Sequence, residues 1–452
     1  MRVTTIDRIA PKPGTFVEWA VEFGAEPAAS PIPPSFNQSF HLAGAEEQSV
    51  WLAAAFDVDG PIDTAALGSA YRTLIQRHPT LRSVFTRCGD APQRAVHSGE
   101  TLELDVRVGA SFDSSPALRN HVRSTMNRRC NKFGDPAYLL AAIDRPDRST
   151  VLCGFDHSHV DAWSIAVVIA ELHHLYLGFQ DEANASDLPA VGSFLDYCAD
   201  EARTAPVDPT DPRLEQWLSF LRDNHGGPPS FPLPLGLPAG TSAPQAVDLR
   251  SLLTAAHADR IEQVCKTNGA SLFAGLLSAV AHAAHAVGGA TAMPVLIPAH
   301  TRRTEELAGA VGWFVTNAPV VVSVASTFEE SLRHNGIALR SAVPLGDVPI
   351  AEVVGAAGGL NLVRHDVFMT SYLDYRRVPG ADLHRSIDAH HISNVTAADD
   401  VQFWFSRTAD GVALRTRFPD TEPARNVMAV FQTELSRVLT DVLEPVQVNA
   451  SK

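Results

Sequence analysis

The sequence is poor in the features that bind nucleic acid, cross membranes or build a disulfide framework. Its 36 lysines and arginines are outnumbered by 51 aspartates and glutamates, for a formal charge of −15. Binding to a phosphate backbone or an anionic membrane surface is therefore not expected. No apolar run reaches the roughly 18 residues of a spanning helix, and the first residues lack the apolar core of a signal peptide. The five cysteines are far apart and without a CxxC spacing, which is typical of free thiols in a reducing compartment. We expect a cytoplasmic protein.

The apolar content and the length of the chain are those of a folded protein with more than one domain. Hydrophobic residues make up 45% of the sequence, which excludes wholesale disorder. A chain of 452 residues is too long for one ordinary core. Nine prolines lie between Ala205 and Pro244, a composition expected to hold neither a helix nor a central strand. We therefore predict an N-terminal subdomain over 1–180, a Pro-rich connection over 181–245 and a C-terminal subdomain over 246–452. The first 45 residues, also Pro-rich, are expected to wrap irregularly over the surface.

Hydrophobic periodicity predicts strands and helices in an irregular order. Asp63 is a candidate N-cap for a helix after the first long apolar run, and the residues after Trp163 have the pattern of an amphipathic helix. Two apolar runs joined by a short polar turn predict a hairpin. The predicted strands are 49–57, 138–143, 150–155, 293–297, 312–322, 367–372 and 401–406, and a closing helix is predicted over 422–443. Since strands and helices mix rather than alternate, an α+β fold is favoured over a doubly wound parallel sheet.

The densest polar cluster lies between an apolar strand and an apolar helix. It reads Asp156-His157-Ser158-His159-Val160-Asp161-Ala162-Trp163-Ser164. A histidine in such a loop can act as a general base, because its ordinary pKa lies near neutrality. A capping or structural role is the commoner one for a lone histidine, so His157 needs supporting evidence. His157 and His159 are also spaced like zinc ligands, but no cysteine or carboxylate completes a set at recognisable spacing. No metal is expected.

Five further segments, together with this cluster, follow one order along the chain. The cluster resembles the family motif HHxxxDG, and the others resemble SxxQ, RHExLRTxF, YxDF, VGxFVNT and QDYPF. In this sequence these five read Ser35-Phe36-Asn37-Gln38, Arg77-His78-Pro79-Thr80-Leu81-Arg82-Ser83-Val84-Phe85, Phe194-Leu195-Asp196-Tyr197, Val311-Gly312-Trp313-Phe314-Val315-Thr316-Asn317 and Gly346-Asp347-Val348-Pro349-Ile350. Together they resemble the condensation-domain superfamily. That superfamily includes non-ribosomal peptide condensation domains, polyketide-associated acyltransferases and chloramphenicol-acetyltransferase-like enzymes.

The resemblance implies an architecture and a set of roles. It implies two chloramphenicol-acetyltransferase-like subdomains in a V-shaped pseudo-dimer, with the active site in the tunnel between them. His157 matches the catalytic histidine, and Asp161 matches an aspartate that forms a structural ion pair with an arginine. Arg302 stands at that arginine's place, with Arg303 as the neighbouring candidate. The candidate substrate-contacting residues are Asp156, Trp163, Thr316, Asn317 and Ser371. No cofactor is implied beyond the phosphopantetheine arm of the donor.

Two departures from the motif bear on the reaction. Asp156 stands where the family has its first histidine, and Ala162 stands where it has glycine. With Ser164, the two aspartates also fit the DxxxxDxxS pattern of heterocyclisation domains, which lack the histidine. His157 therefore favours plain acyl transfer.

The segments PKPGTFVEWAVEF and PIPPSFNQSFHL resemble those of actinobacterial polyketide-associated acyltransferases, which esterify sugars and lipid alcohols. The expected function is that of a free-standing, monomeric acyltransferase in natural-product or lipid biosynthesis. It would move an acyl group from coenzyme A or a carrier protein to a hydroxyl group, forming an ester. The alternatives are a stand-alone peptide condensation enzyme that forms an amide or ester from a carrier-bound aminoacyl group, and a catalytically silent recruiting module.

Overall fold

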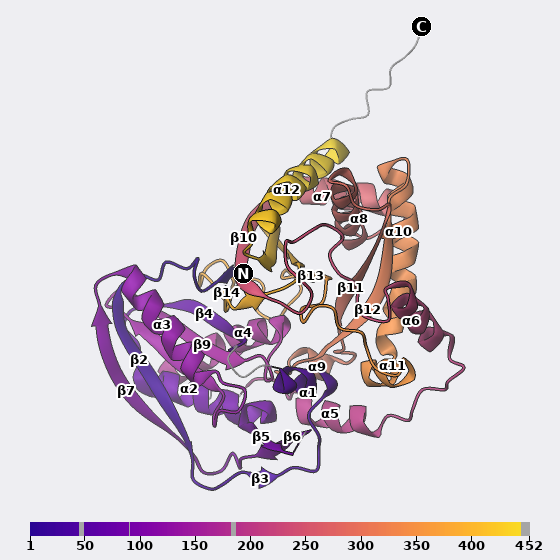
Figure 1. Cartoon of the computed structure of the whole chain (residues 1–452). Coiled ribbons are helices and arrows are strands. Elements are labelled where there is room, and N and C mark those ends of the chain that lie inside the picture. Colours follow the sequence, from indigo (N-terminus) through magenta and orange to yellow (C-terminus); the bar gives the residue numbers. More distant parts are fainter. Residues whose placement is uncertain (45–48, 90, 182–186, 444–452) are drawn as a thin grey trace. The chain divides into compact units, whose positions relative to one another are not determined.

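The computed structural model describes residues 1–44, 49–89, 91–181 and 187–443 (Figure 1). The chain forms two compact units, and each contains a seven-stranded sheet with helices. Unit 1 comprises Met1–Ala205, Thr301–Val315 and Tyr375–Thr396, and unit 2 comprises Pro206–His300, Thr316–Asp374 and Ala397–Lys452. Most strand pairs are antiparallel and the helices do not alternate regularly with the strands. The predicted α+β class is confirmed.

The sheet of unit 1 has the strand order β1-β14-β4-β9-β8-β2-β7. A separate small sheet in this unit has the order β3-β6-β5. The elements of unit 1 are β1 (Arg2–Thr5), β2 (Gly14–Phe23), β3 (Ala28–Ala29), α1 (Phe36–Ala43), β4 (Trp51–Asp59), α2 (Thr64–Arg77), η1 (Pro79–Arg82), β5 (Ser83–Cys88), β6 (Ala91–Val96), β7 (Leu102–Phe112), α3 (Ser115–Arg129), β8 (Tyr138–Asp144), β9 (Arg148–Asp156), α4 (Ala162–Gln180), α5 (Phe194–Arg203), α9 (Glu305–Ala308) and β14 (His390–Ser393).

Local sequence signals account for the elements of unit 1 that lead to the polar cluster. The carboxylate of Asp63 accepts hydrogen bonds from the N–H groups of Ala65 and Ala66 and so caps α2, as predicted. β8 and β9 form the predicted antiparallel hairpin, in which Tyr138 pairs with Phe155. α4 follows as predicted and buries an apolar face that includes Leu172 and Leu175. The polar cluster thus lies between a buried strand and a buried helix, which hold it rigidly.

The expectation that the first 45 residues are irregular is wrong. β2 lies inside the sheet between β8 and β7, and Phe16 and Trp19 on it are each 2% exposed. The prolines lie outside this strand, whose residues FVEWAVEF are apolar and β-branched enough to form one. α1 begins with a capping box, in which Ser35 and Gln38 each bond the other's backbone N–H.

The sheet of unit 2 has the strand order β12-β11-β13-β16-β17-β10-β15. The elements of this unit are α6 (Pro212–Asp223), β10 (Ala243–Thr254), α7 (Ala255–Thr267), α8 (Leu272–Ala286), β11 (Ala292–His300), β12 (Val315–Ser323), α10 (Phe328–Ala342), η2 (Val343–Asp347), α11 (Ile350–Ala356), β13 (Met369–Asp374), β15 (Ala397–Ala398), β16 (Gln402–Thr408), β17 (Gly411–Pro419) and α12 (Glu422–Leu443).

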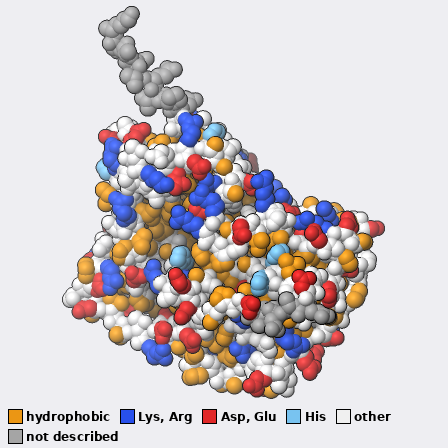
Figure 2. Space-filling model, turned by 180° about the vertical axis from the view of Figure 1, so that it is seen from behind, with side chains coloured by type: hydrophobic (Ala, Val, Ile, Leu, Met, Phe, Trp, Pro, Cys, Tyr) orange, Lys and Arg blue, Asp and Glu red, His pale blue; other side chains and the backbone are white. Residues whose placement is uncertain are grey.

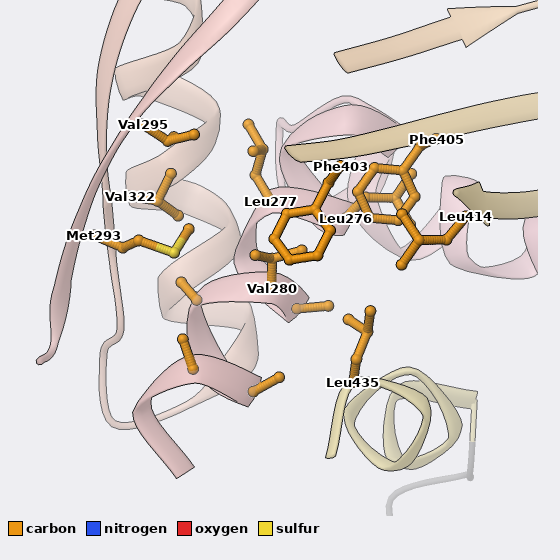
Figure 3. Close-up of a cluster of buried hydrophobic side chains, with 14 of the residues drawn as sticks. Leu276, Leu277, Val280, Met293, Val295, Val322, Phe403, Phe405, Leu414 and Leu435 are labelled. Atoms are coloured by element: carbon orange, nitrogen blue, oxygen red, sulfur yellow. The ribbon is translucent and has the colours of Figure 1, made fainter. Parts of the chain in front are cut away.

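The core of unit 2 forms where one face of its sheet meets the helices. Figure 3 shows side chains from α8, the sheet strands and α12 pointing toward one another. Leu276 and Val280 of α8 and Phe403 of β16 are each 0% exposed. Burial of this apolar surface is the main favourable contribution to the stability of the unit.

The Pro-rich connection and the domain boundaries differ from the sequence-based expectation. The helix α6 lies within 205–244. It tolerates Pro212 because this residue occupies the first turn, where no N–H partner is lost, and Asp211 caps the helix. Each unit is also built from three separate stretches of the chain. β14, from near residue 390, pairs with β1 and β4 of unit 1. Three contiguous segments therefore do not describe the compact units.

A buried carboxylate in unit 2 makes the stability of the protein depend on pH. Asp400 is 0% exposed, and its Oδ1 accepts hydrogen bonds from the N–H groups of Phe231 (3.1 Å) and Val401 (2.7 Å). Burial raises the pKa of Asp400 to about 7, against 3.8 ordinarily. The folded chain therefore binds a proton that the unfolded chain releases at lower pH. This stabilising contribution is complete below about pH 4 and is lost as the pH rises through 7.

We expect Asp400→Asn to flatten this part of the pH dependence. In the wild type, Asp400 should lower the free energy of unfolding by on the order of 3 kcal/mol between pH 4 and pH 8. Urea unfolding of both proteins across that range measures the difference in slope. The exposed Asp410→Asn is the control and should follow the wild type. Parallel curves for Asp400→Asn and the wild type would contradict the expectation.

Helix composition and surface charge bear on the prediction that the protein neither spans a membrane nor binds an anionic membrane surface. Among the described residues, α4 is the single unbroken helix that is long and apolar enough to cross a membrane, and 56% of its apolar stretch is buried inside the protein. This is weak evidence for a span, because core helices have the same composition. On the face shown in Figure 2, Lys and Arg side chains are interspersed with Asp and Glu side chains. A partner that docks on this face would meet charges of both signs.

Candidate active site

The loop between β9 and α4 presents His157 in one defined orientation. The backbone N–H of His157 donates to the carbonyl of Val50 (2.9 Å), and its Nδ1 lies 2.9 Å from the carbonyl oxygen of Val160. Since a carbonyl can only accept, Nδ1 carries the proton and Nε2 carries the lone pair. His157 is therefore held in the tautomer that accepts a proton at Nε2.

An aromatic ring and a lowered pKa complete the environment of His157. Its imidazole stacks on the indole of Trp313, with ring centroids 4.0 Å apart and planes 24° apart. Burial, and secondly the charge of His41, lower the pKa of His157 below its ordinary value. The side chain is therefore neutral near pH 7, which is the form that a general base requires.

Asp161 and Arg302 form a buried, bidentate ion pair beside His157. The two N–O distances are 2.6 Å, from Nη1 of Arg302 to Oδ2 of Asp161, and 3.0 Å, from Nη2 to Oδ1. Asp161 also caps α4, because its Oδ1 accepts from the N–H of Ser164 (2.7 Å). Burial alone would raise the pKa of Asp161, but Arg302 and these hydrogen bonds outweigh it and hold that pKa below its ordinary value. Arg302, rather than Arg303, occupies the place of the arginine that the resemblance implies.

The ion pair also fixes the segment that carries Trp313. Oδ2 of Asp161 accepts from the N–H of Phe314 (3.0 Å), and the guanidinium of Arg302 lies 4.4 Å from the centroid of the Phe314 ring. Gly312 packs so closely that a Cβ there would lie 2.4 Å from Cγ of Phe194. Trp313 is therefore positioned by its neighbours on both sides, and through it the ion pair supports the stacking on His157.

Asp156, a candidate substrate contact by the resemblance, lies in a buried hydrogen-bond network. It is 1% exposed, and its Oδ1 accepts from the N–H (2.9 Å) and the hydroxyl (2.6 Å) of Ser158. Nε2 of His41 lies 2.9 Å from the same oxygen. This buried carboxylate is engaged by Ser158 and by a histidine on α1, and a substrate contact by Asp156 stays a prediction.

The other candidate substrate contacts are Trp163 in unit 1 and three residues of unit 2. Nε1 of Trp163 donates to the carbonyl of Ala308 (2.8 Å), so its indole supports the segment around Arg302. Thr316 and Asn317 on β12 and Ser371 on β13 are partly exposed and belong to unit 2. The Thr316 hydroxyl donates to the carbonyl of Gly346 (3.0 Å). A substrate contact by these three residues stays a prediction.

His41 and the stacking of Trp313 were missed by the sequence analysis. Gln38 and His41 are three residues apart, a spacing that places side chains on one face of a helix. Both reach the polar segment between β9 and α4, since Nε2 of Gln38 donates to the carbonyl of Ser158 (2.8 Å) and Nε2 of His41 contacts Asp156. The spacing of Gln38 and His41 could have predicted that they share a helix face. It could not have predicted which loop that face contacts. Within the described ranges, no group of three His, Cys, Asp or Glu side chains could hold a metal ion.

Comparison with known proteins finds similar sequences and the same fold across most of the chain. The family model "Condensation domain" matches residues 34–397. Acyltransferase PapA3 of Mycobacterium tuberculosis is 28% identical, over 98% of this chain and 97% of its own length. Trehalose-2-sulfate acyltransferase PapA2 of the same species is 27% identical, over 94% of each chain. The solved structure of a PapA2 acyl transferase superposes with a TM-score of 0.89 at 22% identity, over 98% of this chain and 100% of that one. The chain belongs to the condensation-domain family.

Proposed function

We propose that His157 is the general base of an acyl transfer from a thioester to a hydroxyl group. The observation that carries this proposal is the hydrogen bond from Nδ1 to the carbonyl of Val160, which leaves the lone pair of Nε2 for the incoming proton. The hydroxyl oxygen attacks the thioester carbonyl as Nε2 takes its proton, which forms a C–O bond and a tetrahedral intermediate. The intermediate collapses with cleavage of the C–S bond, and the protonated Nε2 returns the same proton to the leaving thiolate, which restores neutral His157. An ester and a free thiol result, with no covalent acyl-enzyme.

The named relatives support a hydroxyl acceptor. They are acyltransferases, and this chain is an enzyme of that kind. The name of one relative specifies a sulfated trehalose as its substrate, and the nucleophiles that a sugar offers are hydroxyl groups. We extend to this chain the class of acceptor, a polyhydroxylated small molecule, and not the particular sugar. The donor would carry its acyl group on a phosphopantetheine arm, from coenzyme A or a carrier protein.

The alternatives differ in the nucleophile or in the presence of catalysis. A peptide condensation enzyme would deprotonate an ammonium group with the same base, so the site geometry alone fits both nucleophiles. A silent recruiting module would need neither the lowered pKa of His157 nor its fixed tautomer. Both features favour catalysis.

The experiment that tests the proposal is acceptor-dependent thiol release. Purified protein is offered a panel of acyl-coenzyme A and carrier-loaded donors with pooled alcohols, sugars and amines, and mass spectrometry identifies the products. Heat-denatured protein is the control for uncatalysed transfer. We expect transfer to hydroxyl acceptors, which gives esters, and no transfer to amines. Amides from carrier-bound aminoacyl donors would support the condensation alternative. No transfer from any donor in the panel would favour the recruiting module.

A further inference from the structure

A second histidine lies beside the proposed base, and nothing in the family motif places it there. His41 lies on α1, more than a hundred residues before His157. Its Nε2 lies 2.9 Å from Oδ1 and 3.1 Å from Oδ2 of Asp156, and its side chain is 10% exposed. Asp156 occupies the position of the family's first histidine. This chain therefore has a carboxylate where the motif has an imidazole, and an imidazole on α1 that binds the carboxylate.

The two histidines share one aromatic neighbour. The ring centroids of His41 and His157 are 6.4 Å apart. The imidazole of His41 meets the indole of Trp313 edge-on, with centroids 5.9 Å apart and planes at 73°, whereas His157 stacks on it. At this separation a charge on one imidazole acts strongly on the protonation of the other, because the surroundings are largely buried.

Asp156, the carboxylate in contact with His41, is buried and held in place by hydrogen bonds. Burial alone would raise the pKa of Asp156, but the hydrogen bond and the charge of His41, with the two bonds from Ser158, outweigh burial and hold that pKa below its ordinary value. Asp156 is therefore ionised near neutral pH. A cationic partner stabilises a buried carboxylate, and the imidazole of His41 contacts Asp156 alongside Ser158.

We propose that His41, held by Asp156, is a positioning residue for His157: its imidazolium lies beside the base and keeps it in the neutral, proton-accepting form. The proposal rests on the proposed function of His157 and adds to it a source of control over its protonation.

Among the described residues, several other charged groups lie around His157. Asp156 and Asp161 both attract a proton to His157, and the charge of His41 opposes them. Asp161 is neutralised by Arg302 from the 301–315 segment. Lys132 donates to the carbonyl oxygens of His41 (3.3 Å) and Gly44 (2.6 Å) at the end of α1. His159, the remaining histidine of the loop, turns to the carbonyl of Thr80 (2.9 Å). Removal of the His41 cation alone thus removes the charge that opposes Asp156 and Asp161 at His157.

The test is a pair of titrations of the full-length wild type and His41→Gln. Glutamine keeps an N–H donor near Asp156 but carries no charge. NMR of the imidazole Cε1–H signals, with the His157 signal assigned by its loss in His157→Asn, reports the pKa of His157 without any substrate. The pH profile of kcat/KM reports the same group in the free enzyme. In His41→Gln we expect the pKa of His157, and with it the acidic limb of the profile, to rise by about one unit.

Two further variants separate charge from structure. The double variant His41→Gln/Asp156→Asn removes both charges, so its pKa for His157 should lie between those of the wild type and His41→Gln. The exposed His174→Asn on α4 should titrate as the wild type does. An unchanged pKa for His157 in a folded His41→Gln overturns the inference, even if kcat falls. If that pKa shifts but no acyl transfer is found, the proposed function fails and the inference about His41 stands.

Discussion

His157→Asn is expected to lower kcat/KM for acyl transfer by roughly 10²–10⁴-fold, the usual contribution of a positioned general base. Asparagine can still donate from its side-chain amide to the carbonyl of Val160, so the hydrogen bond that orients the loop is kept. What is lost is Nε2, the atom that takes the proton. The residual activity should reflect substrate binding and orientation alone.

The measurement is steady-state thiol release with the best donor and acceptor, at saturating and limiting acceptor. We expect kcat to fall much more than KM rises, because the proton transfer takes place in the transition state and not in the bound ground state. Thermal unfolding should match that of the wild type. His174→Asn, on the exposed side of α4, is the matched control and should retain full activity. A fully active, folded His157→Asn would refute the role of His157.

The site could be predicted from sequence where its signals are local. The strand before His157 and the helix after Asp161 follow from continuous apolar runs, and the polar residues between them mark the loop. The ordered motifs added Arg302, which lies far along the chain from Asp161. No pattern in a single sequence gives that distance directly, so this pairing came from the resemblance and not from periodicity.

The remainder depends on tertiary placement that local patterns do not encode. The strand β14, only four residues long, joins the sheet of unit 1 from near residue 390, and so breaks the contiguous domain division. Pro212 suggested an irregular connection but occupies the first turn of a helix, where its missing N–H costs nothing. No signal in the sequence pairs Asp156 with His41, because His41 lies on α1, within the Pro-rich first 45 residues that were expected to be irregular.

Removal of either partner of the Asp161–Arg302 pair is expected to lower the free energy of unfolding by about 3–5 kcal/mol, because the other charge is left buried without compensation. The side chains of Arg302 and Asp161 are 2% and 5% exposed. Asp161→Asn is the milder change, since the amide oxygen can still accept the N–H of Ser164 and cap α4. It should therefore destabilise the protein less than Asp161→Ala.

A double-mutant cycle of Asp161→Ala and Arg302→Met, followed by urea unfolding, measures the coupling. We expect the double variant to be more stable than the sum of the single losses implies, because no isolated charge remains. Arg203→Ala, which breaks a pair with Asp200 in which both side chains are 73% exposed, is the matched control and should change stability little. Strictly additive losses would show that the two residues act independently. The Arg302 variant should also lose acyl transfer at temperatures where it remains folded. Phe314 loses the guanidinium that packs on its ring, and Asp161, which accepts the Phe314 N–H, loses its charged partner, so the neighbouring Trp313 is held less firmly against His157.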